Sequence, residues 1–165
     1  MEYPRFLVLE ASSHEEDAYP VAASWSISTG QLKAVLIRPE DEWRESETST
    51  NDSHHVTRAH TELVGESVLD VIRELSEDVD KQLVYTSEPY LYGKWLTTMY
   101  AAYGAEVSFD MVPLTDLFLM PAGQLEEELE NLASNLLLDL KVSEERVRTL
   151  LELYSRLQES ELLAH

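Results

Sequence analysis

The sequence contains no cysteine and few glycines, and each shortage excludes certain kinds of functional site. Without cysteine, disulfide bonds and thiolate metal sites are excluded. Only five of the 165 residues are glycine, and no GxGxxG or Walker-type phosphate-binding loop is present. There is also no Gly-x-Ser-x-Gly elbow, which would present a nucleophilic serine.

Long apolar runs are also missing. No run approaches the roughly 20 residues that a membrane-spanning helix needs. The first residues, MEYPRFLVLEASS, lack a basic lead and a small-residue cleavage site, and they predict a first strand rather than a signal peptide. We therefore expect a cytoplasmic protein without membrane contact. Its length and its 44% hydrophobic content predict a single domain over residues 1–165.

Basic residues are scarce. The chain has 12 Lys and Arg, of which four are Lys, against 32 Asp and Glu, and the net charge is −20. Such a surface repels nucleic-acid phosphates over about 8 Å at physiological salt, which disfavours nucleic acid as a partner. Two interpretations stay open. The acidity either serves solubility or salt adaptation, or it attracts a basic protein partner, for example by mimicking nucleic acid.

Hydrophobic patterning at the start of the chain predicts three antiparallel strands. A continuous apolar run at 6–9 is typical of a strand buried on both faces. Apolar and small polar residues alternate over 21–28, and after Thr29-Gly30 a further strand is predicted at 31–38. Two strands around such a short turn indicate a hairpin.

The rest of the chain alternates helical and strand patterns. We expect helices over 68–79, 89–103, 113–120, 125–140 and 143–164, and strands at 82–86 and 107–111. Strands separated by helices are expected to be parallel. The predicted fold is therefore α/β, with a mixed five-stranded sheet of three antiparallel strands followed by parallel strands, flanked by helices.

Three motifs, taken in order, carry a resemblance to a known family. FLVLEASS ends the first strand, HHVT occupies 54–57, and LVYTSEPYLYGKWL spans 83–96. Together with the element order they resemble the ribonuclease H-like superfamily, in particular its DEDD-type 3′–5′ exonucleases. The resemblance covers about residues 5–140 and leaves 141–165 as an additional C-terminal helix.

The resemblance implies an active site in which four carboxylates bind two catalytic Mg²⁺ or Mn²⁺ ions. In this chain those four positions fall on Glu10, Ser12, Tyr92 and Asn135, and Glu130 stands where the family has a histidine. Glu10 alone keeps an acid and would hold a metal ion weakly. Ser12 carries no charge, and Tyr92 is neutral at pH 7. We therefore expect a degenerate exonuclease-like domain, a pseudoenzyme that needs no cofactor and acts as a binding or regulatory protein.

Two alternatives remain. The first is an active Mg²⁺- or Mn²⁺-dependent exonuclease with a rearranged site, in which Glu10 is joined by acids such as Glu88, Asp110 or Asp139. The second is an acidic protein-interaction module or nucleic-acid mimic whose fold is incidental. Three converging carboxylates at the end of the first strand would favour the enzyme.

Histidines offer a further metal hypothesis. His54, His55 and His60 lie close together in the sequence and would permit a zinc site, although their spacing does not place two ligands on one helix face. We interpret them as ordinary loop residues. His14, followed by the acidic residues 15–17, is interpreted as solvated loop charge.

The predicted C-terminal helix has leucines on more than one side. They are Leu150, Leu151, Leu153, Leu157, Leu162 and Leu163. A helix that is apolar all round must be buried against something. We therefore expect this helix to contribute a homodimer contact.

Overall fold

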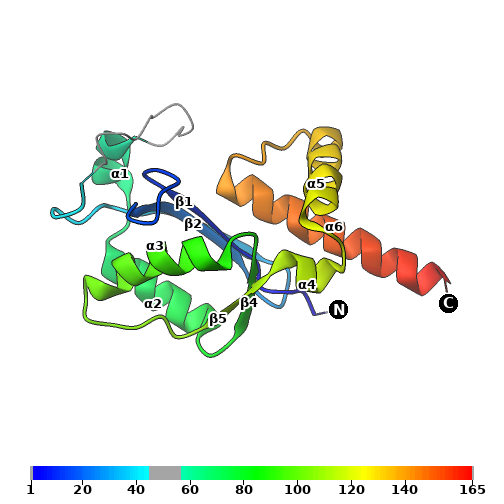
Figure 1. The fold of residues 1–165 in the computed structure, drawn as a ribbon, viewed down its shortest axis with the longest axis horizontal. Helices are drawn as coiled ribbons and strands as arrows, with labels where there is room; N and C mark the ends of the chain where they lie inside the picture. The colour runs from blue at the N-terminus through cyan, green and yellow to red at the C-terminus, as the bar shows by residue number, and fades with distance from the viewer. Residues whose placement is uncertain (1, 45–56, 165) are drawn as a thin grey trace.

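The computed structural model describes residues 2–44 and 57–164, and shows two β-sheets flanked by helices (Figure 1). The elements in chain order are β1 (Leu7–Ala11), β2 (Pro20–Ser26), β3 (Leu32–Leu36), α1 (Arg58–Val64), α2 (Val68–Val79), β4 (Leu83–Thr86), α3 (Pro89–Ala101), β5 (Asp110–Pro113), α4 (Leu114–Phe118), α5 (Ala122–Leu136) and α6 (Ser143–Ala164). The α/β class that the sequence predicts is confirmed.

The first sheet has three antiparallel strands in the order β1-β2-β3, as the hairpin pattern predicts. All seven residues of β2 are buried, because strands flank it on both sides and helices cover the sheet. The turn between β2 and β3 contains Gly30 at φ +88°, where a Cβ would lie 2.9 Å from the ring of Tyr3. Both the backbone conformation and the close ring therefore require glycine at this position.

The second sheet pairs β4 with β5 in parallel, from Leu83 opposite Asp110 to Thr86 opposite Pro113. One isolated parallel bridge, between Phe6 and Tyr85, joins it to the first sheet. We expected one mixed five-stranded sheet. The structure corrects this expectation, because the five strands divide into a three-stranded and a two-stranded sheet. Further along β1, the backbone of Leu9 hydrogen-bonds with the side chain of Tyr92.

Successive side chains along the first strand point to opposite faces of the sheet, and this divides the core into two parts. Leu7 and Leu9 pack into a cluster with α2 and α3, whereas Phe6 and Val8 pack into a second cluster with α4, α5 and α6. Successive side chains of a strand point to opposite faces, so an apolar run is needed where both faces are covered. Figure 1 shows α2 and α3 on one side of the first sheet and α6 on the other.

Several element boundaries differ from the sequence prediction, and one helix was not predicted. Strand β5 begins at Asp110 rather than at 107, because its pairing with β4 begins there, and Phe109 is buried in the core ahead of the strand. Helix α5 ends at Leu136, since Leu137 adopts a left-handed conformation at φ 60°. Helix α1 was not predicted, although Thr57 caps it by accepting a hydrogen bond from the His60 backbone N–H.

The predicted C-terminal helix is confirmed as α6, Ser143–Ala164. Val147, Leu150 and Leu153 of α6 are buried in the second core cluster, and α6 contacts all three strands of the first sheet. These side chains are therefore buried within the chain itself, without a second copy. None of the helices that the structure describes is long and apolar enough to cross a membrane.

Candidate functional site

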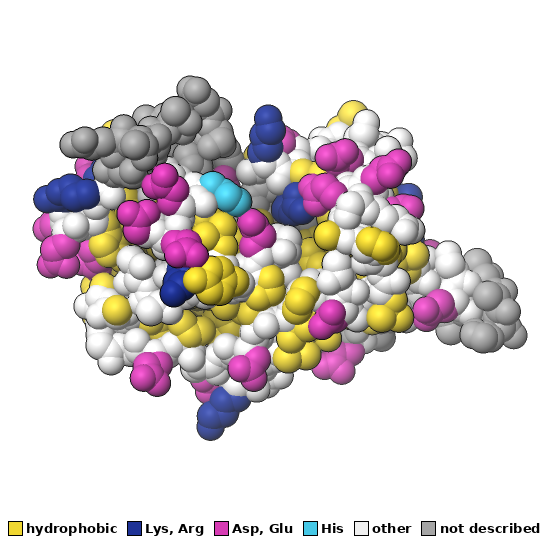
Figure 2. Space-filling model, in the orientation of Figure 1, with side chains coloured by type: hydrophobic (Ala, Val, Ile, Leu, Met, Phe, Trp, Pro, Cys, Tyr) yellow, Lys and Arg dark blue, Asp and Glu magenta, His cyan; other side chains and the backbone are white. Residues whose placement is uncertain are grey.

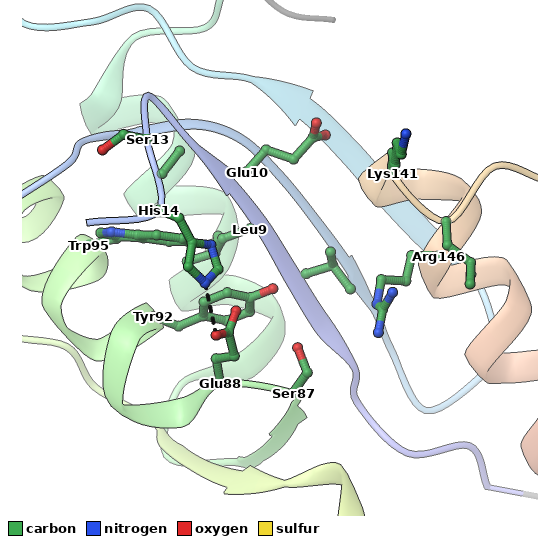
Figure 3. Close-up of a pocket in the computed structure, with 13 residues that line it drawn as sticks. Leu9, Glu10, Ser13, His14, Ser87, Glu88, Tyr92, Trp95, Lys141 and Arg146 are labelled. Carbon is green, nitrogen blue, oxygen red and sulfur yellow. Dashed lines mark hydrogen bonds and ion pairs between the residues drawn. The ribbon is translucent and has the colours of Figure 1, made fainter. Parts of the chain in front are cut away.

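A pocket of about 380 Å³ opens at the C-terminal ends of β1 and β4, beside the first turns of α3 and α6 (Figure 3). Its lining residues are Val8, Leu9, Glu10, Ala11, Ser13, His14, Ser87, Glu88, Tyr92, Trp95, Leu140, Lys141 and Arg146. The carboxyl ends of parallel strands are a common position for binding sites in α/β proteins. The structure thus brings together Glu10 and Tyr92, two of the residues that the sequence predicted.

Glu10 connects the end of β1 to the start of α6. Its Oε2 accepts a hydrogen bond from the backbone N–H of Ser143 at 3.2 Å. The hydroxyl of Ser143 also lies 2.9 Å from the buried hydroxyl of Ser24 on β2. The first backbone N–H groups of a helix have no partner within the helix, and an acid there is favourable. Glu10 therefore stabilises the junction between the sheet and α6.

Ser12 holds the loop that follows β1. Its hydroxyl accepts a hydrogen bond from the backbone N–H of Tyr19 at 3.2 Å, and its own N–H donates to the Tyr19 carbonyl at 2.8 Å. Ser12 is buried, and the neighbouring Ser13 is the one that lines the pocket. The Ser12 hydroxyl is thus engaged in closing this loop.

Tyr92, which the sequence resemblance assigned to a third carboxylate position, is a buried phenol. Tyr92 stacks on Trp95 with ring centroids 5.5 Å apart, and the Trp95 indole donates to the Glu15 carbonyl at 2.8 Å. Burial raises the pKa of Tyr92, although hydrogen bonds with Ser87 and the Leu9 backbone act in the opposite direction. Tyr92 is therefore a neutral hydroxyl on the pocket wall at neutral pH, and it supplies no charge for a cation.

The second carboxylate of the pocket belongs to Glu88, which directly precedes α3. Its Oε1 lies 3.1 Å from Nε2 of His14, a residue of the loop after β1 (Figure 3). The His14 ring also meets Trp95 edge-on, with centroids 6.1 Å apart. Sequence analysis considered both residues but did not pair them, because they are 74 positions apart.

Two basic residues on the opposite wall were missed by sequence reasoning. Arg146, near the start of α6, makes a two-pronged ion pair with Glu126 of α5 at 3.1 and 2.7 Å, and its side chain is 15% exposed. Lys141 precedes α6 and lines the same pocket. Their only sequence signal is basic charge just before and within the first turns of a helix that carries more acidic than basic residues. The pocket therefore combines two acids with two cations.

Other predicted positions lie elsewhere. Asn135 is exposed on α5 and is not part of the pocket lining. Glu130 and Asp139 line a neighbouring pocket of about 500 Å³ between α5 and α6, which shares Lys141 and Arg146 with the first. The structure therefore brings Glu10 and Tyr92 together without Asn135.

The remaining metal candidates are also separated from the pocket. Asp110 is exposed at the start of β5, and its backbone pairs with Leu83 at the opposite end of β4 from Glu88. His60 is exposed on α1, whereas His54 and His55 fall outside the described residues. Asp110 and His60 therefore add no ligand to the pocket.

The donor groups do not fit the two-metal centre that the fold family implies. Across residues 2–44 and 57–164, no three His, Asp or Glu side chains are grouped so that they could hold a metal ion. The two pocket carboxylates, Glu10 and Glu88, each have a protein partner, and Lys141 and Arg146 add positive charge. Two-metal catalysis needs several carboxylates converging on the cations, and this set falls short of that.

Comparison with solved structures shows an exonuclease-like fold. Exonuclease I of E. coli, in complex with a dA16 oligonucleotide, matches with a TM-score of 0.55 and 10% identity over 72% of this chain and 29% of that chain. A moderately thermophilic Exonuclease I from Methylocaldum szegediense matches with a TM-score of 0.56 and 10% identity over 78% and 30%. This chain thus spans about three tenths of the length of these Exonuclease I chains.

A third match covers nearly the whole chain. A chain from the structure of the yeast NOT1 MIF4G domain co-crystallized with CAF1 matches with a TM-score of 0.62 and 11% identity over 98% of this chain and 81% of that chain. No protein-family model and no curated protein matches the sequence. At these identities the likeness establishes the fold alone, and the activity has to be argued from the residues of the pocket.

Proposed function

We propose that this protein is a degenerate exonuclease-like domain without metal-dependent nuclease activity, and that it acts as a binding or regulatory protein. The observation that carries the proposal is the engagement of both pocket carboxylates. Glu10 binds the start of α6 and Glu88 binds His14, so neither is presented as a free ligand to a cation.

The charge of the pocket supports the same conclusion. A two-metal nuclease needs a concentration of negative charge that attracts divalent cations. Here Lys141 adds positive charge beside Glu10 and Glu88, Arg146 is paired with Glu126, and Tyr92 is a neutral phenol. A divalent ion in this pocket would gain at most two carboxylate ligands, and each of them already has a protein partner. Hydroxide generation and charge stabilisation at a phosphate would therefore lack their usual source.

A basic protein partner fits the outer surface better than nucleic acid. The net charge is −20, and Figure 2 shows Asp and Glu side chains spread over one face with only a few Lys and Arg among them. Among the structural matches, Exonuclease I was solved with an oligonucleotide, and the third match is a chain from the NOT1 MIF4G domain co-crystallized with CAF1. For this chain we favour the protein partner, because the acidic surface repels phosphates unless cations screen it.

The active-enzyme alternative rests on the exonuclease-like fold. It requires Glu10 to leave Ser143 and Glu88 to leave His14, so that both can turn toward a metal ion. The ion pair of Glu88 is exposed and is worth little, whereas the contact of Glu10 is part-buried. Release of Glu10 would therefore be the limiting rearrangement.

A cleavage assay tests the proposal. Labelled single-stranded DNA and RNA are incubated with the protein and Mg²⁺ or Mn²⁺, beside the Glu10→Ala variant purified in the same way. We expect the same background cleavage in both samples. Cleavage that needs the metal and disappears in Glu10→Ala would instead establish an active exonuclease with a rearranged site.

A further inference from the structure

A third pocket, of about 290 Å³, lies at the other end of β1 from the candidate functional site. The residues just before β1 form one wall, and β4, α4 and α6 complete it. Its lining residues are Glu2, Tyr3, Pro4, Arg5, Gln82, Leu83, Tyr85, Leu117 and Tyr154. This pocket shares no residue with the first one, so it can be tested independently.

Arg5 is unusual among the basic residues of this acidic chain. Its guanidinium makes no hydrogen bond or ion pair with any residue in the described ranges, and its Nε is buried without an acceptor. The other basic side chains that lack such a partner, for example Arg38, are exposed to solvent. A partly buried and unpaired arginine therefore lines a pocket of a protein with 32 acidic residues available for pairing.

An unpaired buried donor is costly. A buried N–H without an acceptor has given up its hydrogen bonds to water, which destabilises the protein, and more so when the group is charged. The guanidinium offers five donors in a planar fork that matches the oxygens of carboxylates and phosphates. An oxyanion in this pocket would pair with the guanidinium group and neutralise the charge of Arg5.

The surroundings of Arg5 hold it in position. Its carbonyl accepts a hydrogen bond from the Tyr85 N–H at 2.8 Å. On either side of it, the Ser26 hydroxyl accepts from the Phe6 N–H at 2.9 Å and donates to the Pro4 carbonyl at 3.0 Å. The backbone that carries the guanidinium is therefore fixed before any ligand binds, which lowers the entropic cost of binding.

Three tyrosines provide further polar groups around the pocket. Tyr3, Tyr85 and Tyr154 are half-buried around it, and the rings of Tyr3 and Tyr154 lie 6.3 Å apart at 56°. A phenol hydroxyl donates readily to an anionic oxygen. The one acid in the lining, Glu2, is exposed and can turn away into solvent.

We propose that this third pocket, beside Arg5, binds a compact oxyanion through the Arg5 guanidinium. The oxyanion would be the phosphate or carboxylate group of a small ligand. The tyrosines around Arg5 enclose a space that fits one such group with a small moiety attached to it. This site is separate from the exonuclease-like pocket, and its ligand does not depend on whether that pocket is catalytic.

Arginine side-chain NMR tests the proposal on the intact protein. The Nε–Hε signal of Arg5 is followed while inorganic phosphate, acetate or sodium chloride is added at matched ionic strength. We expect a saturable shift at Arg5 with phosphate or acetate, with a dissociation constant on the order of 1 mM or below. The anion with the lower constant identifies the chemistry of the ligand. No saturable shift at Arg5 with either anion, or an equal shift at the exposed Arg38, would overturn the proposal.

Calorimetry with matched variants provides a second readout. Binding of the better anion is expected to be lost in Arg5→Gln and kept in Arg38→Gln, which removes an exposed arginine. Undiminished binding to Arg5→Gln would contradict the assignment. If Arg5→Gln does not fold, the NMR titration of the unmodified chain decides the question.

Discussion

The side chain of Glu10 accepts a hydrogen bond from the backbone N–H of Ser143, a residue 133 positions later in the chain, at 3.2 Å. This contact joins the C-terminal end of β1 to the first turn of α6. It also engages the one acidic residue among the four positions at which the sequence resemblance predicts metal-binding carboxylates. On the function proposed above, this carboxylate fixes a helix to the sheet and does not bind a metal ion.

Removing the Glu10 carboxylate should therefore lower stability. We expect Glu10→Ala to reduce the free energy of unfolding by about 1 kcal/mol, the typical cost of losing a group that binds the N-terminus of a helix. Glu10→Gln keeps an acceptor oxygen and should cost less. Urea unfolding of the three proteins measures both values. A Glu10→Ala protein as stable as the unmodified one would show that this contact contributes nothing.

The ion pair of Arg146 with Glu126 should matter more than the surface pairs of α6. Arg146 is 15% exposed and binds Glu126 through two hydrogen bonds, so Arg146→Met leaves an acid without its partner. We expect a loss of about 2–3 kcal/mol. Arg148→Met is the matched control, because Arg148 is 54% exposed and pairs with Glu144 one turn away. The Arg148→Met variant should lose about 0.5 kcal/mol of unfolding free energy or less. Equal losses in urea unfolding would refute this ranking.

Tyr100 should make stability sensitive to alkaline pH. Burial, followed by the charge of Asp80, raises the pKa of Tyr100 to about 12 from its ordinary value of 10. The folded state therefore favours the protonated phenol. The resulting stabilisation is complete below pH 10 and is lost as the pH rises toward 12.

The Tyr100→Phe variant isolates this contribution. It has no phenol to ionise, so its melting temperature should fall less steeply between pH 10 and 12 than that of the unmodified chain. Thermal unfolding followed by circular dichroism at several pH values makes the comparison. Parallel curves for the two proteins would show that Tyr100 is not protected from ionisation.

Glu66 should have a small destabilising effect at neutral pH. Burial, then the nearby Glu74 and the charge of Asp70, raise the pKa of Glu66. A carboxyl with a raised pKa favours folding below its unfolded pKa, and this contribution is lost as pH rises through the folded pKa. Glu66→Gln should therefore raise the melting temperature at pH 7 by a few degrees, and the gain should shrink near pH 4. A variant that is less stable at pH 7 would contradict this interpretation.

The sequence identified those parts of the fold that depend on local patterning. The run around Leu7 and Leu9, the hairpin around Gly30 and the helix from Ser143 all have the predicted type, because burial on both faces, a tight turn and helical periodicity each leave a local signature. Strand β5 was displaced by several residues. Its position depends on pairing with β4, and Phe109 satisfies the same apolar pattern from outside the strand.

The pocket was only partly predictable for the same reason. Glu10 and Tyr92 lie in motifs that a resemblance can locate, and both line the pocket. The partners of its acids cannot be found in this way, since Ser143 and His14 are 133 and 74 residues away from Glu10 and Glu88. Such pairs become visible only when the fold brings distant segments together.

Calorimetric titration of the protein with Mn²⁺, with Mg²⁺ run in parallel, tests the central claim most directly. The account predicts no saturable binding, and no difference between the unmodified chain, Glu10→Ala and Glu88→Ala, because Glu10 is engaged by the Ser143 N–H and Glu88 by His14. Tight binding of Mn²⁺ that Glu10→Ala abolishes would contradict the account and would show that the pocket assembles a metal centre.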